Sequence, residues 1–320
     1  GNATQVNTIT TAIDSALYNY GVISEQNVST LNLVIGIILA VLIGLILLGG
    51  IKRIGQVAEK LVPFMAVIYI ILAIGVVILN YRNIPTVFAS IFKGAFSPAS
   101  VTGGAVGSFF MSMKKGVSRG IFSNEAGLGS APIAAAAVQT DYPVKQGLVQ
   151  MLSVFIDTIL ICSATAFMLL CSGTAPSVEQ AGMPWVQAAA SSSLGGFGTI
   201  FITIALCLFA FTTLIGNFYY AEMGLQFLCG RKPGKVLLNI FRIVASLVVL
   251  VGATMEFGLV WNMADVLMGL MALINLPVIL ILGGPAIRAM QDYMKQKKEG
   301  KDPEFKAADI QLKDKTDFWN

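Results

Sequence analysis

The chain has 320 residues, of which 56% are hydrophobic and only 12% are charged, and its formal net charge is +4. Soluble domains carry about 25% charged residues, so this composition excludes an ordinary soluble protein and indicates an integral membrane protein. The small net charge speaks against nucleic-acid binding. The sequence contains no histidine, the commonest general base and nitrogen ligand, so neither an enzyme nor a transition-metal site is expected.

The first third of the chain alternates polar stretches with membrane-length apolar runs. Residues 1–30 are polar with apolar positions at helical spacing, which predicts the outer end of a helix followed by a loop. Residues 31–48 and 61–79 each match the ~20 residues that cross a bilayer core, and we expect a short connection between these antiparallel neighbours. Residues 84–98 are too short to span and favour an external amphipathic helix.

The next segment, residues 100–116, is short, apolar and rich in glycine. Such segments are typical of discontinuous transporter helices, which unwind where a ligand satisfies the freed backbone groups. We expect unwinding around Gly103, Gly104, Gly107 and Ser108, where an amino acid or a cation would bind. Close packing of helices on small residues is the alternative interpretation.

The run GVSRGIFSNEAGLGSAPIAAAA, Gly116 to Ala137, follows this segment and has an unusual density of small residues. It contains one cation and one anion, Arg119 and Glu125. We interpret these two residues either as a gating ion pair or as ordinary surface charges.

Four further apolar segments cover residues 144–171, 197–228, 236–255 and 257–290. Asp157 lies within the first, and an intramembrane acid is a candidate functional residue or a structural partner. Arg242 lies near one end of the third and is expected to snorkel to the interface. The last segment predicts one long helix that Pro277 interrupts, with Asp265 near its outer end in a capping or pairing role.

The charges of the connecting loops predict the topology. Lysine and arginine gather in alternate connections and after the last span, so the positive-inside rule places these connections and the C-terminus in the cytoplasm. The sequence therefore predicts a membrane core over residues 1–290 and a solvated cytoplasmic tail over residues 291–320.

Three of the polar side chains in residues 197–228 are candidate ligands on a membrane helix. The hydroxyl oxygens of Thr212 and Thr213 suit a hard monovalent cation, although a threonine in a membrane helix often bonds its own preceding turn. Asn217 lies four residues after Thr213 and shares its face. A substrate contact and an interhelical hydrogen bond are both consistent with this amide.

The glycine-rich run from Gly116 to Ala137 resembles the signature of the alanine or glycine:cation symporter family. The likeness extends over the chain through GNATQVNTITTAI, GGIKRI, LVPFMA, GGAVGS, QGLVQML, FIDT, FAFTTLIGNFYYAE and VWNMAD. The resemblance implies an all-α, polytopic membrane protein, part of a LeuT-like inverted repeat with about seven spans plus the outer end of an eighth. It also implies that the first core helices lie upstream of residue 1, so that the chain is an N-terminally truncated fragment.

By the same resemblance, the GGAVGS segment is the broken sixth core helix, whose Gly103, Gly104, Gly107 and Ser108 line the substrate. FAFTTLIGNFYYAE is the eighth core helix, in which Thr212 and Thr213 provide sodium ligands and Thr213 also lies near the substrate. Family members described as alanine and glycine carriers tend to have tryptophan where this chain has Asn217. An amide there enlarges the site and adds a donor and an acceptor, which favours a larger or more polar substrate such as glutamine.

The resemblance therefore implies sodium-coupled symport of a small neutral amino acid across the plasma membrane by alternating access. Sodium is the coupling ion, no cofactor is expected, and membrane lipid is the surrounding partner. Proton coupling, with Asp157 as the proton site, is an alternative. A passive channel is the rival from another class, although no filter-forming sequence is evident.

Overall fold

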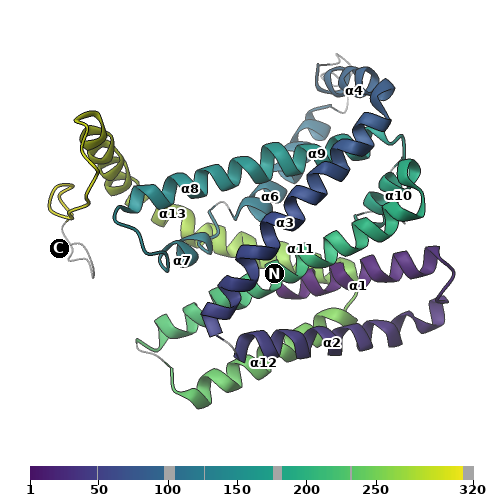
Figure 1. Cartoon of the computed structure of the whole chain (residues 1–320), viewed down its shortest axis with the longest axis horizontal. Helices are drawn as coiled ribbons and strands as arrows, with labels where there is room; N and C mark the ends of the chain where they lie inside the picture. Colours follow the sequence, from purple (N-terminus) through teal and green to yellow (C-terminus); the bar gives the residue numbers. More distant parts are fainter. Residues whose placement is uncertain (49, 97–104, 126, 176–181, 231–232, 313–320) are drawn as a thin grey trace. The chain divides into compact units, whose positions relative to one another are not determined.

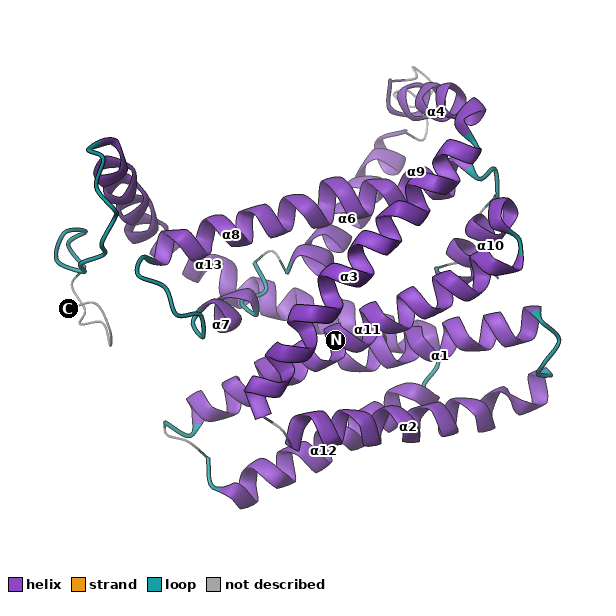
Figure 2. Cartoon of the chain, viewed as in Figure 1, coloured by secondary structure: helices purple, strands orange, loops and turns teal. Residues whose placement is uncertain are grey.

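The computed structural model describes residues 1–320 except 49, 97–104, 126, 176–181, 231–232 and 313–320. The described chain consists of helices joined by short loops and contains no strand (Figure 2). Six of the described helices are long and apolar enough to cross a membrane. The prediction of an all-α, polytopic membrane protein is therefore confirmed, whereas the number of spans stays a prediction.

The chain forms two compact units. The first comprises Gly1–Met111 and Leu160–Ala264, and the second comprises Ser112–Ile159 and Asp265–Asn320. Helices α1 to α4 span Asn2–Asn19, Val28–Leu48, Gly50–Leu79 and Ile84–Phe96, with single 3-10 turns at Glu25–Asn27 and Tyr81–Asn83. Helices α6 to α8 span Ala105–Asn124, Ala131–Ala135 and Pro143–Phe155. A π-helical segment, Ile156–Cys162, then leads into α9 (Ser163–Cys171), which is followed by α10 (Met183–Leu194), α11 (Gly196–Leu228), α12 (Lys235–Thr254) and α13 (Phe257–Lys298).

Helix α11 organises the first unit because two apolar clusters pack on different parts of it. Its second half buries Leu214 and Phe218 against α1, α2 and α12, which Figure 1 shows as neighbours. Its first half buries Ile202 and Ala205 against α3, α9 and α10. Apolar contact alone does not orient helices in lipid, so the polar contacts between them gain importance.

Two buried polar side chains join α1 to its neighbours. The Asn7 amide donates to the carbonyl oxygens of Gly252 and Met255, at 3.4 and 2.7 Å, at the end of α12. The Gln187 amide of α10 donates to the Ala12 carbonyl at 2.9 Å and to the Thr203 hydroxyl at 2.8 Å. The two amides therefore join α1 to α12 and to α10, and residues 1–30 form a packed helix, a short loop and the start of α2.

Arg242 of α12 corrects an expectation from the sequence. Its side chain is only 17% exposed and contacts the Glu222 carboxylate of α11 at 3.2 Å, instead of snorkelling to an interface. Pairing outweighs snorkelling here because the acid lies on the adjacent helix, where it compensates the buried charge.

Two predicted interruptions are also absent. The connection that contains Lys52, Arg53 and Lys60 is helical and forms the first turns of α3. Helix α13 runs without a break through Pro277 and Pro285. A proline removes one backbone donor from a helix, and neighbouring groups within a membrane protein can satisfy the freed carbonyl, so the helix continues.

The tail is not simply solvated over its described part. Helix α13 continues to Lys298, and Ala307 and Ile310 beyond it are buried at 7% and 3% exposure. The Phe305 ring lies 5.1 Å from the Tyr142 ring, and the Arg288 Nε donates to the Ile310 carbonyl at 2.8 Å. Residues 301–312 therefore fold back on the end of α13 in the second unit.

Candidate functional site

The predicted sodium ligands lie side by side on α11. Both hydroxyls donate to the Phe209 carbonyl, the Thr212 Oγ1 at 2.9 Å and the Thr213 Oγ1 at 3.0 Å. This bonding to the preceding turn is the local alternative that the sequence left open. A donating hydroxyl keeps lone pairs that can accept a cation, so the sodium role of both residues stays a prediction.

Asn217 lies at a close contact between α1 and α11. A Cβ atom added to Gly1 would lie 2.9 Å from the Asn217 Nδ2, so a side chain at residue 1 would have to displace this amide. The first unit thus brings the polar N-terminal end of α1 onto the face of α11 that carries Thr213 and Asn217. A substrate contact of Asn217 stays a prediction.

The glycine cluster gives a mixed result. Gly103 and Gly104 lie outside the described residues. Gly107 and Ser108 lie inside α6, so the prediction that the helix unwinds at these two positions is wrong. A single glycine costs a helix only about 1 kcal/mol, which the surrounding helix formers offset.

The run from Gly116 to Ala137 forms the end of α6, a turn and the short helix α7. Gly127 and Gly129 have φ of 81° and 87°, a region that favours glycine. A Cβ atom would lie 2.8 Å from the Leu276 side chain at Gly127 and 3.0 Å from the Asn275 side chain at Gly129. The Asn275 Nδ2 also donates to the Gly127 carbonyl at 3.0 Å. Small residues are therefore required because this turn packs directly on α13.

The structure assigns other partners to the two charges of this run. Arg119 forms a two-pronged ion pair with Asp265 of α13, at 3.1 and 3.2 Å. Glu125 accepts a hydrogen bond from the Ser130 hydroxyl at 2.8 Å. The pairing role expected for Asp265 is confirmed, but its partner lies on a segment that the loop charges placed at the opposite membrane surface. At least one of the two depth assignments is therefore wrong.

Asp157 lies in the π-helical segment between α8 and α9. Its Oδ2 accepts a hydrogen bond from the Ser123 hydroxyl at 2.6 Å, and the adjacent Thr158 donates to the Asn124 amide oxygen at 2.9 Å. Single π-helical turns inside α-helices are frequent at functional sites. Here the π-helical turn presents two successive side chains to the end of α6.

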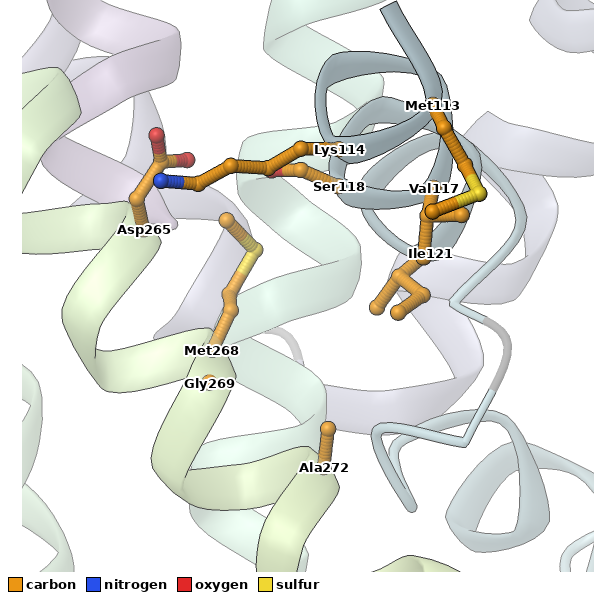
Figure 3. A pocket seen from close by; sticks show the side chains of 9 residues that line it. All are labelled: Met113, Lys114, Val117, Ser118, Ile121, Asp265, Met268, Gly269 and Ala272. Atoms are coloured by element: carbon orange, nitrogen blue, oxygen red, sulfur yellow. The ribbon is translucent and has the colours of Figure 1, made fainter. Parts of the chain in front are cut away.

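A pocket of about 370 Å³ lies between α6 and α13 in the second unit (Figure 3). Met113, Val117, Ile121, Met268 and Ala272 provide its apolar wall. Figure 3 shows the Lys114 side chain extending from α6 toward Asp265, next to Ser118. The pocket thus combines an apolar wall with one cation and one anion, which suits a small amphipathic molecule.

The comparison with known proteins identifies the family. A family model described as the sodium:alanine symporter family matches residues 1–307. The chain belongs to this family. The resemblance found in the sequence motifs is therefore confirmed.

Among relatives in the sodium:alanine symporter family, the amino-acid carrier protein AlsT of Bacillus subtilis is 43% identical over 97% of this chain and 62% of its own length. The protein named "Probable sodium/glutamine symporter GlnT" of the same organism is 41% identical over 95% of this chain and 60% of its own. The sodium/alanine symporter AgcS of Methanococcus maripaludis is 39% identical over 90% of this chain and 60% of its own. The chain thus spans about three fifths of the length of these relatives.

No sequence pattern identified Lys114, Ser118 or Met268 as lining the pocket between α6 and α13. Residues 113–121 and 265–272 are separated by more than a hundred positions, and no local pattern indicates that they meet. The partnership of Ser123 with Asp157 was missed for the same reason. The small and apolar residues of α6 did indicate that this helix has a face that contacts another helix, but not which helix it contacts.

Proposed function

We propose that this chain forms part of a carrier that moves a small neutral amino acid of the alanine or glycine type across the plasma membrane together with sodium. The match of the sodium:alanine symporter family over residues 1–307 is the observation that carries the proposal. The names of AlsT and AgcS, an amino-acid carrier and a sodium/alanine symporter, support it, as do six apolar helices among the described residues. In this role the chain is a transporter and not an enzyme, with sodium, the amino acid and membrane lipid as partners and no cofactor or nucleic acid.

The working mechanism is alternating access in a LeuT-like inverted repeat. Thr212 and Thr213 on α11 provide oxygen ligands for sodium, and Thr213 and Asn217 contact the substrate together with residues 103, 104, 107 and 108. Sodium binding stabilises the state that binds substrate, and by linkage substrate binding strengthens sodium binding to the same extent. The C-terminus lies in the cytoplasm, as the loop charges indicate.

The run from Gly116 to Ala137 acts in this proposal as a close-packed part of the gate. The contact of Gly127 and Gly129 with α13 supports this role, because a side chain at either position would meet the Leu276 or Asn275 side chain at or below normal contact distance. The ion pair of Arg119 with Asp265 and the hydrogen bond of Ser123 with Asp157 join the same helix end to α13 and to the π-helical segment.

Uptake of labelled alanine into vesicles that contain the full-length protein tests the coupling ion and the carrier mechanism. We expect uptake above the external concentration when sodium is present outside, and loss of this accumulation when choline replaces sodium at fixed pH. Accumulation that persists in choline would contradict sodium coupling. Uptake that never exceeds the external concentration would identify a passive channel instead.

Glutamine is a second candidate substrate. Two observations favour it: the Asn217 amide at the α1–α11 contact and the relative named as a probable sodium/glutamine symporter. Competition of labelled alanine uptake by unlabelled amino acids separates the candidates. Competition restricted to alanine and glycine would rule out glutamine, and a stronger effect of glutamine than of alanine would replace the first candidate.

Proton coupling is tested at Asp157, since another relative is named a sodium/proton-dependent alanine carrier protein. Asp157→Asn retains an acceptor for the Ser123 hydroxyl but removes the titratable proton. If Asp157 carries a coupled proton, this variant abolishes the dependence of uptake on external pH. Unchanged pH dependence would leave Asp157 with a structural role only.

A further inference from the structure

An apolar groove runs along the outside of the first unit, between the second half of α3 and the start of α11. It has a volume of about 530 Å³, and its wall includes Ile71 and Ile78 on α3 and Phe197 and Phe201 on α11. Gly75 lies between the two isoleucines along α3, and a Cβ atom added there would meet nothing within 4 Å. The groove is therefore open at Gly75, where α3 lacks a side chain.

The length of the groove fits one leaflet of a bilayer. Its wall follows α3 from Ile68 to Leu79, which corresponds to roughly 17 Å at a rise of ~1.5 Å per residue. The hydrocarbon core of a bilayer is about 30 Å thick, so the groove covers about half of it. The acyl chain of one lipid also extends over one leaflet, so its length matches the groove, whereas a helix that crossed the bilayer would fill the groove with only part of its length.

The groove ends at a polar margin that resembles a membrane interface. Helix α3 ends at Leu79, and the next residue, Asn80, donates from its side chain to the Ser193 hydroxyl at 2.6 Å. Tyr81 and Arg82 follow, and the Arg82 guanidinium carbon lies 6.0 Å from the centre of the Tyr81 ring. Tyrosine and arginine are the side chains that favour the level of lipid headgroups.

Arg82 has unused capacity to bind an anion. Among the described residues, no carboxylate forms an ion pair with it, and its hydrogen bond to the Tyr81 hydroxyl is long at 3.5 Å. A guanidinium binds phosphate oxygens through two parallel donors, so this exposed cation complements a lipid phosphate. Arg82 follows the last lining residue of α3, Leu79, by three positions, and its charge favours a negatively charged phospholipid over a neutral apolar occupant.

We propose that the groove between α3 and α11 binds one acyl chain of an anionic phospholipid whose phosphate is held by Arg82. The apolar wall buries the chain, the open side faces the bilayer, and the phosphate lies beyond Leu79. A lipid held in this way covers α3 and the start of α11 and joins them on the membrane side.

Native mass spectrometry of the full-length protein in detergent tests the proposal, with phosphatidylglycerol and phosphatidylcholine as probes. The wild type is expected to retain phosphatidylglycerol preferentially. Arg82→Gln should weaken phosphatidylglycerol binding about fivefold and phosphatidylcholine binding much less, because one cation near a headgroup contributes about 1 kcal/mol. Gly75→Phe, which fills the groove, should reduce retention of both lipids.

Two matched controls accompany these variants. Lys235→Gln removes an exposed cation at the start of α12, and Gly224→Phe adds the same ring at another helical glycine whose Cβ would meet nothing within 4 Å. Both should retain phosphatidylglycerol like the wild type, and all four variants should unfold at the same temperature without added lipid. Retention of phosphatidylglycerol at the wild-type level by both Arg82→Gln and Gly75→Phe would overturn the proposal. Dimers that cross-link through a cysteine placed at Ile71 would also overturn it.

Discussion

The ion pair of Arg242 and Glu222 shows how strongly single charges act inside this molecule. The two side chains are 17% and 13% exposed, and the Arg242 Nε and the Tyr219 hydroxyl are buried without a hydrogen-bond partner among the described atoms. Removal of either charge leaves the other uncompensated in an apolar surrounding. The pair is therefore a structural requirement for the α11–α12 contact, whether or not it adds net stability.

The first prediction concerns this pair. Glu222→Gln or Arg242→Met should destabilise the protein by about 3–5 kcal/mol, measured by denaturant unfolding in detergent. The exchange Glu222→Arg with Arg242→Glu should recover most of the loss, and Glu299→Gln in the exposed Lys301–Glu299 pair should change nothing measurable. A single substitution at Glu222 with no effect would show that the charges are solvated.

The second prediction concerns the sodium ligands. Thr212→Ala together with Thr213→Ala removes two hydroxyl oxygens whose hydrogen bonds to Phe209 are local, so the fold should tolerate the change. The sodium concentration for half-maximal uptake should rise about tenfold, as expected for a loss of ~1.4 kcal/mol of ion binding. Thr254→Ala, which removes an exposed hydroxyl bonded to its preceding turn on α12, is the matched control. Unchanged sodium dependence would exclude both threonines from the site.

At the scale of elements, close helix packing depends on glycine at particular positions of α12 and its neighbours. A Cβ atom at Gly252 would lie 2.8 Å from the Ala3 Cα, and one at Gly36 would lie 2.7 Å from the Ala253 Cβ. These distances are below normal contact, so α1, α2 and α12 approach one another only because both residues are glycine.

The third prediction follows from this packing. Gly252→Leu should destabilise the first unit by about 1–3 kcal/mol, since α1 must move to make room, and the change is measured by thermal unfolding. Gly224→Leu on α11 is the matched control, because a Cβ atom there meets nothing within 4 Å. Equal unfolding temperatures for the two variants would contradict the packing argument.

Sequence patterns predicted most of the helices because a continuous apolar run in a membrane chain has one stable backbone arrangement. They failed at the ends and interruptions of helices. The charged residues 52–60 gave no indication of a helix, yet they extend α3, and Pro277 did not break α13. The π-helical segment around Asp157 was also unforeseen, since an inserted residue leaves the apolar pattern almost unchanged.

The candidate site was predictable only in part, because its residues pair across long stretches of sequence. The motifs identified α11 and the run from Gly116 to Ala137 as functional candidates. The partners of Arg119 and Asp157, by contrast, are set by tertiary packing. The acid nearest to Arg119 along the chain is Glu125, but the observed ion pair of Arg119 is with Asp265. Periodicity locates helix faces but does not determine which faces meet.

At the scale of the whole molecule, the segment after α13 completes the second unit. The Tyr142 ring is fully buried and contacts the rings of Tyr293 and Phe305 at 5.0 and 5.1 Å. Its hydroxyl lies 2.8 Å from the Asp292 carboxylate and 3.0 Å from the Ala289 carbonyl. The Gln296 side chain joins Asp292 to the backbone of Glu304. The connection before α8, the end of α13 and residues 301–312 therefore form one packed cluster.

The fourth prediction is a loss of stability of this cluster at high pH that depends on Tyr142. Burial, together with the hydrogen bond to the Asp292 carboxylate, raises the pKa of Tyr142 above its ordinary value near 10. The folded state thus prefers the neutral phenol, so its stabilising contribution is complete below pH ~10 and is lost as the pH rises above the pKa of the unfolded chain. Tyr142→Phe should therefore lower the unfolding temperature at pH 8, where a hydrogen bond worth about 1 kcal/mol is missing. Between pH 9 and 11 the wild type should lose more stability than this variant, so that the two unfolding temperatures converge, whereas parallel curves would show that the phenol does not titrate with unfolding.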